Sequence, residues 1–333
     1  MNKVTIKDIA EKVGVSANTV SRAINDKGEI SEETKEEILE VAKELDYRPN
    51  RLARGLRLNK TGILGVVVAD NANPFFGAVV KGIEEVAEKN GYSVILKDTE
   101  ENYAREEKSV EIMIAEQVEG VVISPVQKGR RSLQILEDAS IPYVLLARYF
   151  DDIRADYVAI DDEQGGFLAT QHLLEREHRR IAFINGPQYN SSAQARFKGY
   201  KKALTEAEVK IDKSLIKYGA LSEEDGYKFG QELLSSNNHP SAIFTFSDYV
   251  ALGAIRAVHK RGFEIPEDIS VLGYDNIVFS RCLKVPLTTI SVPKRKLGRE
   301  ACRLLVRKIE NDEKDQVTQK KLPVELLKRS TTK

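Results

Sequence analysis

The side chains of Asn18 and Arg22 carry groups that can read DNA bases. In the major groove an asparagine can form two hydrogen bonds to adenine and an arginine two to guanine, and each good pair discriminates between bases by about 1–3 kcal/mol. Hydroxyl groups nearby suit phosphates, which position a protein without reading sequence. The residues of this segment that we expect to contact DNA are Thr5, Ser16, Ala17, Asn18, Thr19, Ser21, Arg22 and Asn25.

These side chains need a helix with one open face, and the residues around them predict one. Apolar residues recur at helical intervals from Ile6 to Val13. Thr5 and Asp8 fit a capping box at the start of this first helix. Gly14 tolerates the positive φ of a tight turn, and Ser16 caps a second helix, whose open face carries the base-reading residues.

A third helix is predicted to begin at Ser31, because two acids follow it in the first turn, where they favour the helix dipole. The apolar faces of the second and third helices fall within Val20–Ile24 and Ile38–Leu45. Three such helices bury one another and leave one face of the second exposed. The pattern indicates a helix-turn-helix, whose second helix can enter the major groove. The alternative is a plain three-helix bundle with a polar surface.

Next comes a segment of concentrated positive charge. The whole chain is neutral, with 51 Lys and Arg against 51 Asp and Glu. Five positive residues and no acids lie within 48–60, namely Arg48, Arg51, Arg54, Arg57 and Lys60. Such a segment can neutralise phosphates and release counterions even when the rest of the chain is neutral.

Within this segment the run PNRLARGLRL, residues 49–58, favours a short helix. Pro49 suits a first turn, and Leu52, Ala53 and Leu56 fall near one face. A helix this short is marginal alone, so we expect it to fold on meeting DNA and a second copy. Leu56 is then a candidate wedge between base steps in the minor groove; the alternative is a basic linker without a wedge. The expected DNA-contacting residues here are Asn50, Arg51, Ala53, Arg54, Leu56 and Arg57.

Further along the chain, a second group of residues could hold a small polar molecule. Aromatic rings after Pro74 can cover the apolar face of a sugar or base, although core packing is an equal alternative for each. Arginines can fork onto hydroxyls, and a carboxylate can accept two hydroxyl bonds; the alternative for each charge is a surface ion pair. Asp248 could instead cap a helix. The expected ligand-binding residues are Asn73, Phe75, Phe76, Arg148, Arg196, Phe246, Ser247, Asp248 and Asp275.

Most of these residues fall at the ends of predicted strands. Strand-like runs are 63–69, 94–96, 121–124, 143–146, 158–160, 181–184, 242–246 and 270–273, with helical patterns such as 76–90, 103–117, 166–176, 193–205 and 249–261 between them. Regular alternation predicts an α/β fold with parallel sheets and helices on both faces. Roughly 270 residues exceed one small open sheet, so two lobes are expected. Ligands in such folds bind outside the carboxyl ends of the strands.

The chain resembles the lactose/galactose-repressor family of bacterial transcription regulators. The N-terminal resemblance rests on TIKDIAEKVGVSANTVSRAIN and RPNRLARGLR. Beyond them it rests on NPFFGAVVKGIEEVAEKNGY, IDDEQGGFLATQHL, HRRIAFINGP, TFSDYVALGAIRAVHKRG, ISVLGYDN and LTTISVP, which are similar to an effector-binding core like that of periplasmic sugar-binding proteins. The resemblance implies homodimers on palindromic operator DNA, with base contacts from Ala17, Asn18 and Arg22 and a wedge at Leu56.

The resemblance also implies a division of the chain. A helix-turn-helix headpiece spans 1–47, a hinge 48–61, and an effector-binding and dimerisation core 62–333. The family fold crosses between lobes three times, which places about 62–161 and 290–320 in the first lobe and about 162–289 and 321–330 in the second. An effector would change the angle between the lobes and hence the spacing of the two hinges.

Departures from ribose-type binding proteins limit the identity of the effector. Those proteins have an acid directly before the arginine that corresponds to Arg148, where this chain has Ala147. They have an amide at the position of Ser247 and an aromatic residue near that of Leu221. A sugar or sugar derivative, which could be a sugar phosphate, is the expected effector. A purine, another small metabolite or a phosphoprotein co-repressor are the alternatives.

Other functions find less support in the residues. No apolar run approaches the ~20 residues of a membrane span, and the N-terminus has no apolar leader, so a cytoplasmic protein is expected. The segment 1–60 argues against the main non-regulatory alternative, a solute-binding protein. Two cysteines and scattered histidines suggest no metal site. The common nucleophile, phosphate-loop and zinc motifs are missing, so neither an enzyme nor a cofactor is expected. The C-terminus lacks a leucine heptad, which favours a dimer.

Overall fold

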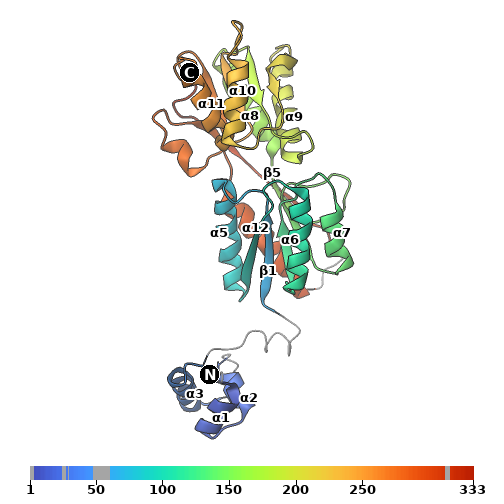
Figure 1. Cartoon of the computed structure of the whole chain (residues 1–333), viewed down its shortest axis with the longest axis vertical. Coiled ribbons are helices and arrows are strands. Elements are labelled where there is room, and N and C mark those ends of the chain that lie inside the picture. The colour runs from blue at the N-terminus through green and yellow to red at the C-terminus, as the bar shows by residue number, and fades with distance from the viewer. Residues whose placement is uncertain (1–3, 25–27, 29, 48–60, 312–315) are drawn as a thin grey trace. The chain divides into compact units, whose positions relative to one another are not determined.

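The computed structural model describes residues 4–24, 28, 30–47, 61–311 and 316–333, and contacts divide the chain into two compact units, Met1–Thr61 and Gly62–Lys333. The described part of the first unit holds three helices, α1 (Ile6–Val13), α2 (Ala17–Ile24) and α3 (Glu32–Glu44) (Figure 1). Ile9, Val20 and Ile38, one side chain from each helix, are completely buried together. The apolar faces that the sequence predicted therefore form a single small core.

Local hydrogen bonds set the ends of these helices. The amide and the hydroxyl of Thr5 donate to the carboxylate of Asp8, over 2.7 and 2.8 Å. Gly14 has φ 77° and ψ 25°, the left-handed turn that ends α1. The hydroxyl oxygen of Ser16 accepts from the amide of Thr19 at 3.1 Å, so α2 begins where the sequence predicted. The side chain of Ser31 accepts from the amide of Thr34 in the same way, so the predicted start of the third helix is confirmed.

The larger unit contains two sheets, each with six strands in the described residues. One has the order β11-β5-β4-β3-β1-β2 and the other β12-β10-β9-β8-β6-β7. Neighbouring strands run parallel except β10 and β12. The strands of the first sheet are β1 (Ile63–Val68), β2 (Ser93–Asp98), β3 (Gly120–Ile123), β4 (Tyr143–Ala147), β5 (Tyr157–Ile160) and β11 (Gln319–Leu322). Those of the second are β6 (Ile181–Ile184), β7 (Ile216–Lys217), β8 (Ala242–Thr245), β9 (Ser270–Asp275), β10 (Thr288–Ser291) and β12 (Glu325–Leu327).

Helices flank both sheets, as Figure 1 shows. The first lobe carries α5 (Pro74–Lys89), α6 (Tyr103–Ala115), α7 (Arg131–Asp138) and α12 (Lys294–Asn311). The second carries α8 (Asp162–Glu175), α9 (Ser191–Glu206), α10 (Glu223–Leu233) and α11 (Asp248–Lys260), with short 3-10 turns η1 (Lys213–Leu215) and η2 (Val278–Arg281). This is the doubly wound, two-lobed α/β arrangement that strand–helix alternation predicted.

The chain passes between the lobes three times, after β5, after β10 and after β11. The first passage falls at the expected boundary. The other two fall about two residues later than the limits 289/290 and 320/321, because Ser291 still pairs with Asp275 and Leu322 still pairs with Ile160. A strand stays in its sheet until its last ladder partner, and hydrophobic pattern alone does not mark that residue.

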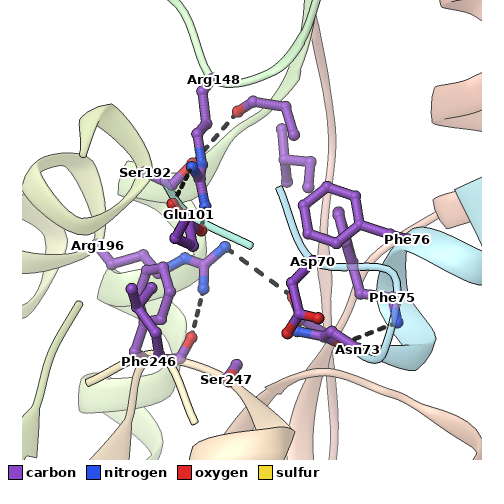
Figure 2. Close-up of a pocket in the computed structure, with 14 residues that line it drawn as sticks. Asp70, Asn73, Phe75, Phe76, Glu101, Arg148, Ser192, Arg196, Phe246 and Ser247 are labelled. Atoms are coloured by element: carbon purple, nitrogen blue, oxygen red, sulfur yellow. Dashed lines mark hydrogen bonds and ion pairs between the residues drawn. The ribbon is translucent and has the colours of Figure 1, made fainter. Parts of the chain in front are cut away.

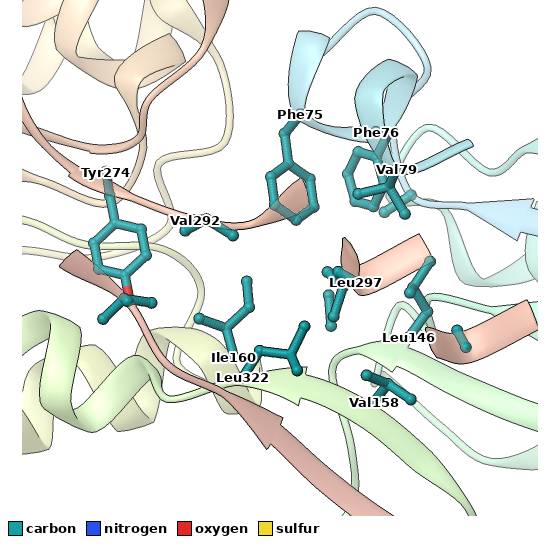
Figure 3. Close-up of a cluster of buried hydrophobic side chains, with 14 of the residues drawn as sticks. Phe75, Phe76, Val79, Leu146, Val158, Ile160, Tyr274, Val292, Leu297 and Leu322 are labelled. Atoms are coloured by element: carbon teal, nitrogen blue, oxygen red, sulfur yellow. The ribbon is translucent and has the colours of Figure 1, made fainter. Parts of the chain in front are cut away.

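Apolar residues gather around these passages (Figure 3). Phe75 and Phe76 of α5 pack edge to face, with centroids 5.0 Å apart, in the same buried cluster as Ile160, Tyr274 and Leu322. Strands such as β3 are buried along their whole length, as expected for a parallel sheet covered on both faces. The cluster brings the carboxyl ends of several strands close to one another.

Candidate ligand pocket and DNA-reading helix

One face of α2 presents three of the predicted DNA-contacting side chains to solvent. Ala17, Asn18 and Arg22 are exposed, as are Thr5 and Ser16 before their helices. Thr19 is half-buried, and its hydroxyl lies 2.9 Å from that of Ser16. The exposed side chains can therefore approach base edges or phosphates without rearranging the bundle core.

Ser21 corrects one prediction. It was expected on the open face of α2, but only 8% of it is exposed. It lies between the buried Val20 and Ala23, where a side chain this small is covered by its surroundings. Several other predicted DNA contacts lie outside the described residues: Asn25, Asn50, Arg51, Ala53, Arg54, Leu56 and Arg57.

The larger unit has a pocket at the carboxyl ends of its strands, with about 580 Å³ of space that includes some open solvent. Eight of the nine expected ligand-binding residues line it, all except Asp248. Figure 2 places the labelled arginines on one side and Phe75 and Phe76 on the other. The lining residues are Asp70, Asn73, Phe75, Phe76, Glu101, Ala147, Arg148, Ile160, Ser192, Arg196, Leu221, Phe246, Ser247 and Asp275.

Asp248 is instead buried and accepts hydrogen bonds within the protein interior. Its carboxylate accepts hydrogen bonds from the amide of Ile277 at 2.8 Å and from the hydroxyls of Ser280 and Thr289 at 2.5 Å each. Burial raises its pKa to about 6, against the lowering effect of these bonds. The residue that caps α11 is Ser247, which accepts from the amide of Val250. Asp248 thus takes the first position inside the helix and ties α11 to β10 and to the segment after β9.

Arg148 meets a carboxylate that sequence reasoning missed. Its Nη1 donates to Oε2 of Glu101 at 2.9 Å and to the carbonyl of Pro125 at 3.1 Å, and its Nη2 donates to Oε1 of Glu101. Burial alone would lower the pKa of Arg148, but the charge of Glu101 outweighs it and raises the pKa. The pair is bidentate, the geometry in which a guanidinium binds a carboxylate most specifically.

Arg196 is held between two aromatic rings. Its guanidinium carbon lies 3.6 Å from the ring centroid of Tyr274 and 4.6 Å from that of Phe246. Its Nε donates to Asp162 at 2.8 Å, its Nη1 donates to the carbonyl of Phe246, and its Nη2 lies 4.0 Å from Oδ1 of Asp275. Burial would lower its pKa, but Asp162 chiefly reverses this and raises it. Arg196 is therefore fixed before any ligand arrives.

Close packing of α8 against α9 allows this placement. A Cβ atom on Gly166 would overlap the carbonyl group of Arg196, and one on Gly199 would overlap that of Glu163. The two helices approach this closely only because these positions lack side chains. Their approach brings Asp162, at the start of α8, within reach of Arg196 on α9.

Asp275 lies in a turn held by a lysine from the other lobe. Asp275 and Asn276 have φ of 106° and 54°, both in the left-handed region. Lys294, the first residue of α12, donates from Nζ to the carbonyls of Asp275, Asn276 (2.8 Å) and Val292 (3.4 Å). Burial raises the pKa of Asp275 to about 8, opposed by Arg196 and Lys294 and reinforced by Asp248. Lys294 is thus a positioning residue that the sequence reasoning missed.

The remaining polar groups of the pocket are mostly engaged in their own loops. Asn73 caps α5 by accepting from the amide of Phe75 at 3.0 Å. Asp70 accepts from the amide of Ala72, and its pKa is raised by burial. The hydroxyl of Ser192 donates to the carbonyl of Ala147 at 3.2 Å. The result is a preformed concave site with aromatic rings on one side and donors and acceptors on the other, which suits a small polar ring molecule.

Comparison with known proteins identifies the family. Residues 61–330 match the model of periplasmic binding proteins and the sugar binding domain of the LacI family, and residues 5–50 match that of bacterial regulatory proteins of the lacI family. The chain belongs to the LacI family. It is 36% identical over 306 residues to the HTH-type transcriptional repressor PurR of Pasteurella multocida (strain Pm70), with 92% of each chain covered. It is 36% identical over 307 residues to the ribose operon repressor of Haemophilus influenzae (strain Rd), again with 92% of each covered.

A solved structure of the LacI family agrees with the fold. The crystal structure of the Lac repressor dimer bound to operator and the anti-inducer ONPF matches this chain with a TM-score of 0.88 and 30% identity, over 99% of both chains. The predicted fold and the prediction of a DNA-binding transcription regulator rather than an enzyme are confirmed by the family. Among the helices of the described residues, none has the length and apolar character needed to cross a bilayer.

Proposed function

We propose that two copies of this chain bind a palindromic operator and repress transcription, and that a sugar or sugar derivative in the pocket controls the affinity for DNA. The observation that supports this class of ligand is the pocket, where aromatic rings face two guanidinium groups and several carboxylates. An aromatic ring covers the apolar face of a sugar, while charged groups exchange hydrogen bonds with its hydroxyls. The name of one relative, a ribose operon repressor, supports this class of ligand.

On the DNA side, Ala17, Asn18 and Arg22 contact base edges, while Thr5 and nearby hydroxyls contact phosphates. The exposure of Ala17, Asn18 and Arg22 on α2, and of Thr5 and Ser16 just before their helices, supports this assignment. The basic segment 48–60 supplies most of the charge that neutralises the DNA backbone, with Leu56 as the wedge. In this proposal residues 1–47 read DNA. Residues 48–61 connect them to residues 62–333, which bind the effector and the second copy. The protein acts in the cytoplasm, where operator DNA is found.

A palindrome needs two readers, and the larger unit offers an apolar surface for pairing. Val278 and Phe279 of η2 are 51% and 50% exposed, the largest exposed apolar side chains in the described part of this unit. Covering them with the same turn of a second copy would remove apolar surface from water. The matching Lac repressor structure is of a dimer, which supports the same assembly here.

The ligand acts through the angle between the two lobes. The pocket is lined from both lobes, so its occupant contacts both and favours one angle over others. That angle sets the separation of the two basic segments in a dimer. A coupling free energy of ~1–3 kcal/mol between ligand and DNA is enough for regulation.

The experiment begins with selection of DNA sequences from a random pool by the full-length protein. We expect the selected sites to be palindromic, and fluorescence anisotropy to show a preference for them over random duplex. Neutral sugars, nucleobases and sugar phosphates are then screened for a change in operator affinity. The absence of any sequence preference, with and without these compounds, would refute the proposal.

A further inference from the structure

We infer that the pocket takes an uncharged ligand and that Glu101 excludes anionic ones, phosphorylated sugars among them. This inference rests on the proposed function, in which the pocket binds the effector. It narrows that proposal, since a sugar phosphate and a neutral sugar differ by a charged group that the pocket must either neutralise or refuse.

The first step is the charge of the lining. Three acids, Asp70, Glu101 and Asp275, line the pocket with two bases, Arg148 and Arg196. Each base already pairs with a carboxylate: Arg148 with Glu101, and Arg196 with Asp162 just behind the wall. Both guanidinium groups of the wall are thus already neutralised by a carboxylate, so an incoming anion would find no uncommitted cation among the lining residues that the structure describes.

The lysine and the helix N-termini near the pocket also have hydrogen-bond partners already. Lys294 is bonded to three carbonyls behind the turn of Asp275 and does not line the pocket. Helix N-termini attract anions, but those nearest the pocket are capped by their own side chains. Asn73 caps α5, Ser247 caps α11, and Asn190 caps α9 through the amides of its first turn.

The second step is the way Glu101 is placed. Glu100 and Glu101 both have left-handed backbone, with φ of 49° and 54°, an unusual conformation for residues with side chains. The carboxylate of Asp98 accepts from the amide of Glu100 at 2.9 Å, and the amide of Glu101 donates to the carbonyl of Ala69 at 2.8 Å. These bonds hold a strained turn whose result is a carboxylate aimed at Arg148. Backbone outliers held by their surroundings concentrate at functional sites.

The third step is hydrogen-bond complementarity. A guanidinium only donates and a carboxylate only accepts, so the Arg148–Glu101 pair offers both roles side by side. A hydroxyl or an amide edge can accept from one and donate to the other. A phosphate dianion only accepts, and it would lie beside the like charge of Glu101, whose side chain is largely buried, so the repulsion is weakly screened. The pair therefore suits hydroxyls and rejects phosphate.

Position in the chain strengthens this assignment. The residue directly before Arg148 is Ala147, so no neighbour in the chain offers this arginine a carboxylate. Glu101 supplies a carboxylate to the same arginine from the loop after β2, across 47 positions of the chain. The side chains of Arg148 and Glu101 are only 7% and 14% exposed, so the pair is part of the wall rather than a surface contact.

The test uses the full-length protein and its Glu101→Gln variant, which keeps the size and removes the charge. Thermal unfolding is followed with D-ribose, D-ribose 5-phosphate and inorganic phosphate, each compared with sodium chloride at equal ionic strength. Glu100→Gln is the matched control, since it removes a neighbouring exposed carboxylate that does not line the pocket. Arg148 is left without its carboxylate in Glu101→Gln, so we expect phosphate and ribose 5-phosphate to raise the melting temperature of this variant only. Calorimetry should show binding of the phosphorylated sugar that is at least about tenfold tighter than in wild type, the effect of removing one nearby like charge.

Two results would overturn the inference. One is a wild-type protein that binds ribose 5-phosphate or inorganic phosphate as tightly as the variant does. The other is a Glu101→Gln protein that responds to these anions no more than Glu100→Gln does. If Glu101→Gln does not fold, the wild-type arm decides alone, because tight binding of phosphorylated sugars to it contradicts exclusion and its absence supports it. Operator affinity in the presence of neutral compounds is measured separately, so a failure of the proposed function is distinguishable from a failure of this inference.

Discussion

On α2 the side chains of Asn18 and Arg22 are exposed, whereas in the pocket those of Arg148 and Arg196 are buried and already hold carboxylates. Exposed side chains lose rotamer freedom when they bind, while the pocket residues are ordered beforehand. The two regions therefore serve different tasks. A reading helix can sample many DNA sites and gain order on the correct one, while a preorganised pocket discriminates among small molecules by fixed donors and acceptors.

The largest expected effect is the loss of the effector response by a change in the pocket, which would distinguish the role of the pocket from that of α2. Asp275→Ala removes a lining carboxylate from the turn that Lys294 holds, so we expect the effector response to be abolished while operator binding persists. Glu267→Ala, the loss of an exposed carboxylate in the same lobe, serves as the control. Operator affinity is measured with and without the effector found by screening. A full response in the Asp275 variant would remove this residue from the site.

A change on the reading helix should have the opposite pattern. Arg22→Ala should weaken binding to the selected operator by roughly 10–100-fold, the value of one bidentate base contact, and change binding to random duplex far less. Lys43→Ala on α3 removes the same charge from an exposed position of the same unit. Anisotropy with operator and random DNA compares the two variants. Equal losses on both kinds of DNA would mean that Arg22 contacts phosphate rather than a base.

The three described helices of the first unit could be predicted almost completely from the sequence. Its helices depend on contacts between residues three or four positions apart, and its turn depends on one glycine, Gly14, so the local pattern carries the information. Ser21 was the exception, because burial at the border of a helix face depends on what packs beside it. In the pocket, eight residues could be predicted because strand ends converge at one edge of a parallel sheet.

The rest of the pocket depends on alignments that no local pattern encodes. Glu101 reaches Arg148 only because two left-handed residues turn the loop after β2. Ser247 and Asp248 are adjacent. Ser247 caps α11 and lines the pocket, whereas the carboxylate of Asp248 accepts hydrogen bonds in the protein interior. Lys294 follows a lobe crossing whose exact place depends on the last ladder pair of β10. Such pairings become visible only when the strands are placed side by side.

A smaller effect is expected from a residue through which the ligand pocket influences DNA binding. Lys294→Met removes the bonds from α12 to the carbonyls of Asp275 and Asn276, which belong to the other lobe. We expect the effector to change operator affinity several-fold less than in wild type, with operator affinity in its absence unchanged, since residues between two sites modulate coupling by about 0.5–2 kcal/mol. Lys296→Met, an exposed lysine two positions later, is the control. An unchanged coupling ratio would limit Lys294 to a local role.

The last prediction concerns pH and the stability of the pocket. The pKa of Asp275 is raised to about 8 by burial, with Arg196, Lys294, Asp248 and Asp162 as the charged groups that act on it. An aspartate in the unfolded chain ionises near pH 4. Between these values the unfolded state releases a proton that the folded state keeps, so this residue lowers the free energy of unfolding as pH rises from about 4 to 8.

Asp275→Asn removes this dependence with little change in shape. The wild type should therefore lose melting temperature relative to this variant as pH increases from 5 to 8, and the difference should level off above about pH 8. Other titrating groups largely cancel because both proteins contain them. Thermal unfolding of the two proteins at a series of pH values tests the expectation. A difference that does not vary with pH would mean that Asp275 is ionised throughout, held by Arg196 more strongly than burial opposes it. That outcome would also make the pocket more negative near pH 7, and so less favourable for an anion.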